Sequence, residues 1–165
     1  MKKPVRKLVL SALFAALSCM MTMIIQIPAP TGYVNLGDCA VLLGGWVLGP
    51  LWGGAAAGLG SMLADVLNGW ASYAPATFLI KFAVAAVAAL IFRVVGKNCG
   101  MLLGAAIGEL LMVGGYFLYE SFVLGVGTAA VASIPANLVQ GAVSVAAGVA
   151  AAVLLERGGI LDRLK

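Results

Sequence analysis

The chain has 165 residues, of which 63% are apolar and only 10% carry a charge, with no histidine and a formal net charge of +4. Soluble domains average about 25% charged residues, so this composition excludes an ordinary soluble domain and indicates an integral membrane protein. A chain of this length has room for a single membrane domain, residues 1–165, and none for a soluble nucleotide-binding module.

Five long apolar runs follow one another with short breaks, and each is close to the roughly 20 residues that span a bilayer core. They cover approximately Lys7–Ile27, Leu51–Leu67, Ala74–Val95, Met101–Val123 and Ala129–Leu155. A sixth apolar segment, Asp38–Leu48, is too short to cross alone at about 1.5 Å per residue. Whether this segment crosses decides the topology.

The positions of the basic residues bear on that question. If the short segment is re-entrant, Arg93 and Lys97 lie on the opposite face from the N-terminal basic cluster. If it crosses, all nine flanking basic residues share one face, and the positive-inside rule favours this arrangement. These residues are Lys2, Lys3, Arg6, Lys7, Arg93, Lys97, Arg157, Arg163 and Lys165. We therefore expect an all-α integral membrane protein of six transmembrane helices, the second one short, in a prokaryotic plasma membrane with both termini cytoplasmic.

Two sets of small residues predict close helix packing, because small residues at i and i+4 let helix backbones approach each other. The run Gly53–Ser61 is small on nearly every helical face, so we expect it to pack inside the bundle. Ala12 and Ala16 have the same spacing on the first span. This pair could instead mark a docking face for another protein.

Lys81 is the only basic residue inside an apolar run. An ionisable side chain at the centre of a bilayer costs roughly 2.5–3.5 kcal/mol on insertion scales, and such residues commonly mark functional sites. Two interpretations stay open. The ammonium faces a ligand, or it forms an ion pair with Asp65 that neutralises both groups.

Polar and aromatic residues of several spans are expected to meet at the outer level of the membrane. Tyr116 and Glu120 lie on one face of the fifth span, and Asn137 and Gln140 share a face of the last span. Ligand sites are mostly apolar with a few polar groups that fix orientation, so this convergence predicts a substrate site. Of the residues at this level, the family resemblance described below assigns the following to the site: Asn35, Trp70, Tyr73, Lys81, Tyr116, Glu120, Asn137 and Gln140.

Several of these residues also have structural explanations. Trp70 could be an interfacial belt residue, and Asn137 and Gln140 could hydrogen-bond neighbouring helices. Glu109 shares the face of Tyr116 but lies deeper, and it could serve packing or gating.

The sequence offers no set of residues for catalysis or metal binding. It has no phosphate-binding loop and no Ser–His–Asp set, and Cys19, Cys39 and Cys99 lack metal or redox spacing. We therefore predict neither an enzyme nor a bound metal or cofactor. Energy for uphill transport would have to come from another chain or from an ion gradient.

Several stretches carry a resemblance to a known family. They are Gly32-Tyr-Val-Asn35-Leu-Gly-Asp38, Leu48-Gly49-Pro50, Gly58-Leu-Gly60-Ser-Met-Leu-Ala-Asp65, Tyr73-Ala-Pro75-Ala-Thr77-Phe-Leu-Ile-Lys81 and Ile134-Pro-Ala-Asn137-Leu-Val-Gln140. Over most of its length the chain resembles the substrate-binding S components of energy-coupling factor (ECF) vitamin transporters.

The resemblance implies a six-helix protein that binds a vitamin or precursor near the outer face and hydrolyses nothing itself. The loop 28–37 would act as a lid over a pocket formed by the predicted substrate-binding residues. Ala12 and Ala16 would dock on a transmembrane coupling protein, which associates with two ATPase subunits. The S component would topple in the membrane to release its substrate inward.

The chemistry of the predicted site suits a small flat heterocycle with hydroxyl groups or ring nitrogens, because rings stack on aromatic faces and buried polar groups need partners. Riboflavin is one candidate. The stripe from Glu109 to Glu120 more closely resembles S components for pyridoxine-like or hydroxymethylpyrimidine compounds. The alternative function is an ion-coupled secondary transporter of a small metabolite, with Asp65, Glu109 and Lys81 as a relay.

Overall fold

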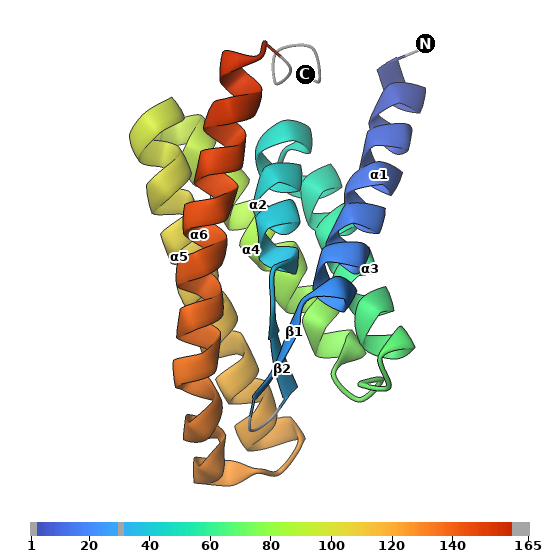
Figure 1. The fold of residues 1–165 in the computed structure, drawn as a ribbon, viewed down its shortest axis with the longest axis vertical. Helices are drawn as coiled ribbons and strands as arrows, with labels where there is room; N and C mark the ends of the chain where they lie inside the picture. Colours follow the sequence, from blue (N-terminus) through green and yellow to red (C-terminus); the bar gives the residue numbers. More distant parts are fainter. Residues whose placement is uncertain (1–2, 30–31, 160–165) are drawn as a thin grey trace.

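The computed structural model describes residues 3–29 and 32–159, which form a bundle of six α-helices with one short β-hairpin (Figure 1). The helices are α1 (Lys3–Ile24), α2 (Gly37–Leu48), α3 (Pro50–Leu67), α4 (Ala74–Val95), α5 (Lys97–Leu118) and α6 (Ile134–Arg157). The strands β1 (Gln26–Ala29) and β2 (Gly32–Asn35) join α1 to α2. A π-helical turn, η1 (Tyr119–Val123), and a 3₁₀ helix, η2 (Gly127–Ser133), join α5 to α6.

All six predicted helices are present, and the second is short, with 12 residues. By length and hydropathy, the helical stretches among the described residues that are able to cross a bilayer are Pro4–Ile24, Ala74–Val95, Cys99–Val123 and Gly127–Arg157. α2 is apolar but shorter, and the small residues of α3 lower its hydropathy. To cross a bilayer, these two helices would therefore need neighbouring helices to shield them from the lipid.

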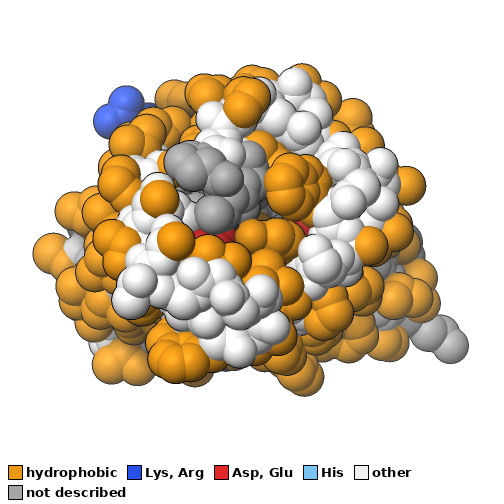
Figure 2. Space-filling model, turned by 90° about the horizontal axis from the view of Figure 1, so that it is seen from below, with side chains coloured by type: hydrophobic (Ala, Val, Ile, Leu, Met, Phe, Trp, Pro, Cys, Tyr) orange, Lys and Arg blue, Asp and Glu red, His pale blue; other side chains and the backbone are white. Residues whose placement is uncertain are grey.

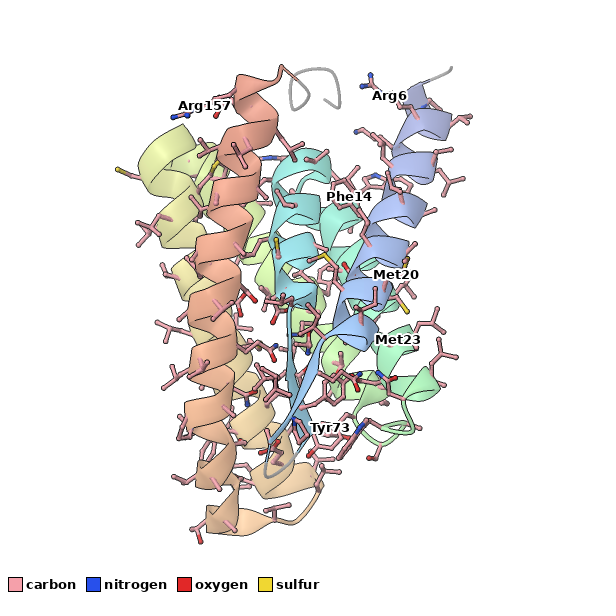
Figure 3. All side chains as sticks on the ribbon, viewed as in Figure 1. Arg6, Phe14, Met20, Met23, Tyr73 and Arg157 are labelled. Atoms are coloured by element: carbon pink, nitrogen blue, oxygen red, sulfur yellow. The ribbon has the colours of Figure 1, made fainter. Side chains whose placement is uncertain are left out.

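The helices alternate in direction, so the start of α1 and the end of α6 lie at the same end of the bundle (Figure 1). Arg6 and Arg157 mark this basic end (Figure 3). The β1–β2 hairpin, the connection between α3 and α4, and η2 lie toward the opposite end. Tyr73 lies in that half (Figure 3), which we call the cleft end.

The sharpest reversals, between α2 and α3 and between α4 and α5, each use a single glycine. Gly49 and Gly96 have φ angles of 85° and 96°, a region that glycine adopts without a steric penalty. Pro50 then opens α3 in a position where its missing N–H costs nothing. The chain can therefore reverse in one residue and keep successive helices in contact.

The expectation that the run Gly53–Ser61 packs inside the bundle is confirmed. A Cβ atom on Gly53 would lie 2.6 Å from the carbonyl oxygen of Gly44 in α2, and one on Gly58 would lie 2.7 Å from that of Phe78 in α4. Both distances are too short for a side chain. Backbone contact on two sides of α3 thus requires these glycines.

Some predicted element boundaries were wrong. The first helix ends at Ile24 and not at Ile27, and Gln26–Ala29 pair with Gly32–Asn35 in an antiparallel hairpin. Pro28 explains this, because it disfavours helical dihedrals at the preceding residue. The fifth helix starts at Lys97, four residues before its predicted start, and the last α-helix starts at Ile134 with Pro135 in its first turn.

Candidate functional site

A cleft opens at the cleft end, between the hairpin and the ends of α3, α4, α5 and α6. It encloses about 510 Å³ of empty space with its mouth included, which sets an upper limit on what fits without movement. Figure 2 views this end and shows acidic side chains inside a hollow with apolar side chains around it. The described lining residues are Ala29, Tyr33, Asn35, Asp65, Trp70, Tyr73, Thr77, Tyr116, Glu120, Ser133, Ala136, Asn137 and Gln140.

Aromatic rings form one side of the cleft as a connected series. The ring centroids of Tyr33 and Trp70 are 6.2 Å apart, those of Trp70 and Tyr73 5.8 Å, and those of Tyr73 and Tyr116 6.5 Å. The rings come from β2, the α3–α4 connection and α5. Tilted and edge-on contacts of this kind are favourable between aromatic rings and hold them in place.

Two carboxylates lie among these rings. Asp65, near the end of α3, accepts a hydrogen bond of 2.8 Å from the hydroxyl of Tyr33. Burial raises the pKa of the Tyr33 phenol above its usual value, so this hydroxyl keeps its proton and donates. Oε1 of Glu120, in η1, accepts a hydrogen bond of 3.4 Å from the hydroxyl of Tyr73. Its Oε2 is buried with no hydrogen-bond partner among the described residues.

A fully buried polar network adjoins the cleft. The ammonium of Lys81 lies 2.6 Å from Oδ1 of Asp38, and the amide of Gln140 donates to Oδ2 of Asp38 at 2.6 Å. The side-chain oxygen of Gln140 accepts the backbone N–H of Asn35 at 2.9 Å. We call Asp38, Lys81 and Gln140 the buried network. It ties α2, α4, α6 and the hairpin together.

The structure corrects the partner of Lys81, which is Asp38 and not Asp65. α2 begins near the middle of the bundle (Figure 1), and Asp38 in its first turn has no exposed surface. Because α2 starts at the depth of Lys81, its carboxylate reaches the ammonium. Asp65 instead interacts with Tyr33 in the cleft wall.

Comparison with known proteins identifies the family. Residues 2–157 match the family described as ECF-type riboflavin transporter, S component. The chain belongs to this family. The predicted resemblance to ECF S components is thus confirmed, and membership places the chain among the substrate-binding subunits of ECF transporters, which are not enzymes.

Two further proteins are similar to this chain. An uncharacterized protein in the gap 3′ region of Pyrococcus woesei is 34% identical over 145 residues, covering 86% of this chain and 97% of the relative. A structure titled "Structure and mechanism of the S component of a bacterial ECF transporter" superimposes with a TM-score of 0.77 at 19% identity, covering 94% of this chain and 98% of that one. The second match shows that this S component shares its fold.

Of the eight predicted substrate-binding residues, all but Lys81 line the cleft of this S component. Lys81 lies behind the wall with 3% of its surface exposed, and its ammonium is 5.4 Å from the centre of the Tyr116 ring. The structure therefore brings the predicted residues together. It places Lys81 one layer deeper than expected.

Tyr33 and Thr77 are the polar lining residues that the sequence analysis most clearly missed. Thr77 lies midway between Tyr73 and Lys81 at a spacing of four residues, so helical periodicity puts it on the same face. Tyr33 precedes Asn35 by two residues, and alternate residues of a strand share a face. The Thr77 spacing could be read from the sequence, whereas the Tyr33 signal requires knowing that Gly32–Asn35 form a strand.

The remaining predicted residues lie away from the cleft. Ala12 and Ala16 are on the exposed face of α1. Glu109 is 4% exposed inside the bundle, and neither carboxylate oxygen has a hydrogen-bond partner among the described residues. The part of the chain that the structure describes contains no group of three or more His, Cys, Asp or Glu side chains placed to hold a metal ion.

Proposed function

We propose that this S component is the high-affinity capture subunit of an ATP-driven ECF importer, and that it binds a small flat heterocyclic vitamin or precursor in the cleft. The observation that carries the proposal is the series of aromatic rings with polar groups between them. Flat ligands stack on such rings, and a few fixed donors and acceptors orient them.

Two classes of ligand are candidates. The family description names riboflavin, which makes it the first compound to test. The stripe that ends at Tyr116 and Glu120 led us to pyridoxine-like or hydroxymethylpyrimidine compounds, and both of these residues line the cleft. The alternative of an ion-coupled secondary transporter gains no support from the family match.

The hairpin β1–β2 is the proposed lid. Tyr33 and Asn35 reach the cleft from β2, and the backbone of Asn35 is bonded to Gln140 on α6. Opening the lid would break this bond and the one between Tyr33 and Asp65. Residues 30 and 31 of the predicted lid lie outside the described residues.

We further propose six crossings with both termini cytoplasmic. Arg6 and Arg157 lie at one end of the bundle, the end away from Tyr73 (Figure 3), and the positive-inside rule assigns such an end to the cytoplasm. The cleft would then face outward. Lys2, Arg163 and Lys165, which also entered the topology prediction, lie outside the described residues.

A transmembrane coupling protein with two ATPase subunits is the proposed partner, and Ala12 and Ala16 are its proposed contact. Both alanines lie on the exposed face of α1, where small residues allow another helix to approach closely. Replacing either with Trp should abolish uptake in cells and leave ligand binding by the purified subunit unchanged. Lost binding would contradict the docking role.

A binding screen tests the main proposal. Purified protein in detergent, without ATP or partners, is titrated by calorimetry with riboflavin, pyridoxine and hydroxymethylpyrimidine, and at least one should bind. Tyr73→Ala should weaken that binding severalfold, because it removes a ring contact from the cleft. Phe122→Ala is the control, since Phe122 is an aromatic residue of the same region with 78% of its surface exposed.

Failure of all three compounds, extended to the other B vitamins with the same result, would refute the proposal. So would equal effects of Tyr73→Ala and Phe122→Ala, because binding would then not depend on the cleft.

A further inference from the structure

The charged side chains that the structure describes in the cleft lining are all acidic. Among the residues that the structure describes, the charged side chains lining the cleft are Asp65 and Glu120, and no Lys or Arg lines it. The nearest cation in the fold, Lys81, lies 2.6 Å from Asp38 in the buried network. Its closest carboxylate is therefore Asp38, and no described cation lies in the cleft lining beside the two carboxylates of the wall.

Glu120 is a buried carboxylate of the cleft wall whose hydrogen bonds are incomplete among the described residues. Only 2% of this residue is exposed, yet Oε2 has no hydrogen-bond partner among the described residues, and the one donor to Oε1 is at the long distance of 3.4 Å. A buried carboxylate without compensation is costly, since its charge loses the hydration it has in water. Glu109 is equally unpaired among the described residues but lies away from the cleft. The position of Glu120 in the cleft lining, and not its missing partner alone, therefore points to a ligand that supplies the donor.

The aromatic rings favour the same sign of charge. Tyr33, Trp70 and Tyr73 line the cleft, and the faces of aromatic rings attract cations through their quadrupoles. Carboxylates and ring faces thus act together on a positively charged group. An anion would meet two carboxylates and no described cation in the lining.

We infer that the ligand of this cleft is a flat heterocycle that carries a positive charge, as a protonated amine or a cationic ring nitrogen, which pairs with Glu120. Asp65, which also lines the cleft, adds to the negative potential. The inference rests on the proposed function and narrows its ligand class. It also implies that phosphorylated or carboxylated forms of the same heterocycle are rejected.

Matched ligands test the charge. Pyridoxamine and pyridoxine share one ring, but pyridoxamine carries an ammonium group where pyridoxine has a hydroxyl. Thiamine has a fixed positive charge, whereas riboflavin is neutral. Calorimetric titration should show that pyridoxamine binds more tightly than pyridoxine, or thiamine more tightly than riboflavin. The preference should be about 10- to 100-fold, as expected for a hydrogen bond to a charged group, and pyridoxamine 5′-phosphate should not bind.

Charge-removing variants then locate the effect. Glu120→Gln should abolish the preference for the cationic member of the pair. The control is Glu109→Gln, which removes a buried carboxylate of the neighbouring α5 that does not line the cleft. It should leave the preference intact.

The outcomes separate the two proposals. Tight binding of riboflavin or pyridoxine with no preference for the cationic probes would overturn the inference and leave the proposed function standing. Binding by none of the probes would overturn both. Should Glu120→Gln fail to fold, the ligand pairs on the unmodified protein still decide the matter.

Discussion

The cleft and the buried network lie side by side and use similar side chains, but their polar atoms are satisfied differently. In the network, Asp38 receives Lys81 on one oxygen and Gln140 on the other, both at 2.6 Å. In the cleft, Glu120 has one distant donor and one oxygen without a partner among the described residues. The comparison teaches that burial alone does not distinguish a structural carboxylate from a binding one. Missing hydrogen bonds together with a place in the cleft lining do, since Glu109 is also unpaired among the described residues but does not line the cleft.

The largest effect is expected from breaking the network at its cation. Lys81→Met leaves Asp38 buried without a counter-charge, and removing one member of a buried pair typically costs about 3–5 kcal/mol. We expect a loss of this size in the free energy of unfolding, measured by denaturant titration in detergent micelles. The double variant Lys81→Met/Asp38→Asn should recover part of it, because it removes the stranded charge as well.

Lys81→Met also separates the network from ligand contact. If Lys81 is structural, the variant that remains folded should still bind ligand, with affinity reduced only as far as the fold is weakened. Normal stability combined with lost binding would show that the ammonium faces the ligand after all.

An intermediate effect is expected where the two regions meet. Gln140 lines the cleft and also bonds Asp38 and the backbone of Asn35. Gln140→Leu leaves a buried acceptor and a buried N–H unpaired, at a cost of about 1–3 kcal/mol each. We expect reduced stability in thermal unfolding together with weaker ligand binding.

Asn137→Leu is the control for that variant. Asn137 is a half-buried amide on the same wall and the same helix. It should lower stability less than Gln140→Leu does. Equal losses from the two variants would contradict the anchoring role of Gln140.

The helices of this protein could be predicted from sequence because apolar run length and proline or glycine breaks act locally. The hairpin could not, since Gln26–Ala29 continue the apolar run of α1 and four residues are too few to establish a strand period. The error mattered, because the hairpin supplies Tyr33 and Asn35 to the cleft.

The same division holds for the site. Tyr116 with Glu120, and Asn137 with Gln140, were predicted correctly to meet, because helical spacing puts each pair on one face. The partner of Lys81 was missed because it depends on the depth at which α2 starts. Tertiary packing sets that depth, and no local pattern in residues 37–48 records it. Periodicity gives the face of a helix and not its height in the bundle.

The smallest effect on stability is expected at Glu120, and it sharpens the comparison most. Glu120→Gln keeps the shape of the side chain and an acceptor for Tyr73, and it removes a charge that has no described counter-ion in the cleft. No strong native interaction is lost. The free energy of unfolding of the ligand-free variant should therefore lie within about 0.5 kcal/mol of that of the original protein, or above it. A loss comparable to that of Lys81→Met would mean that Glu120 is structural. Unchanged stability, with a lost preference for cationic ligands, would show that the carboxylate of Glu120 serves ligand binding. The charges of Asp38 and Lys81 in the buried network would then be the ones that stabilise the fold.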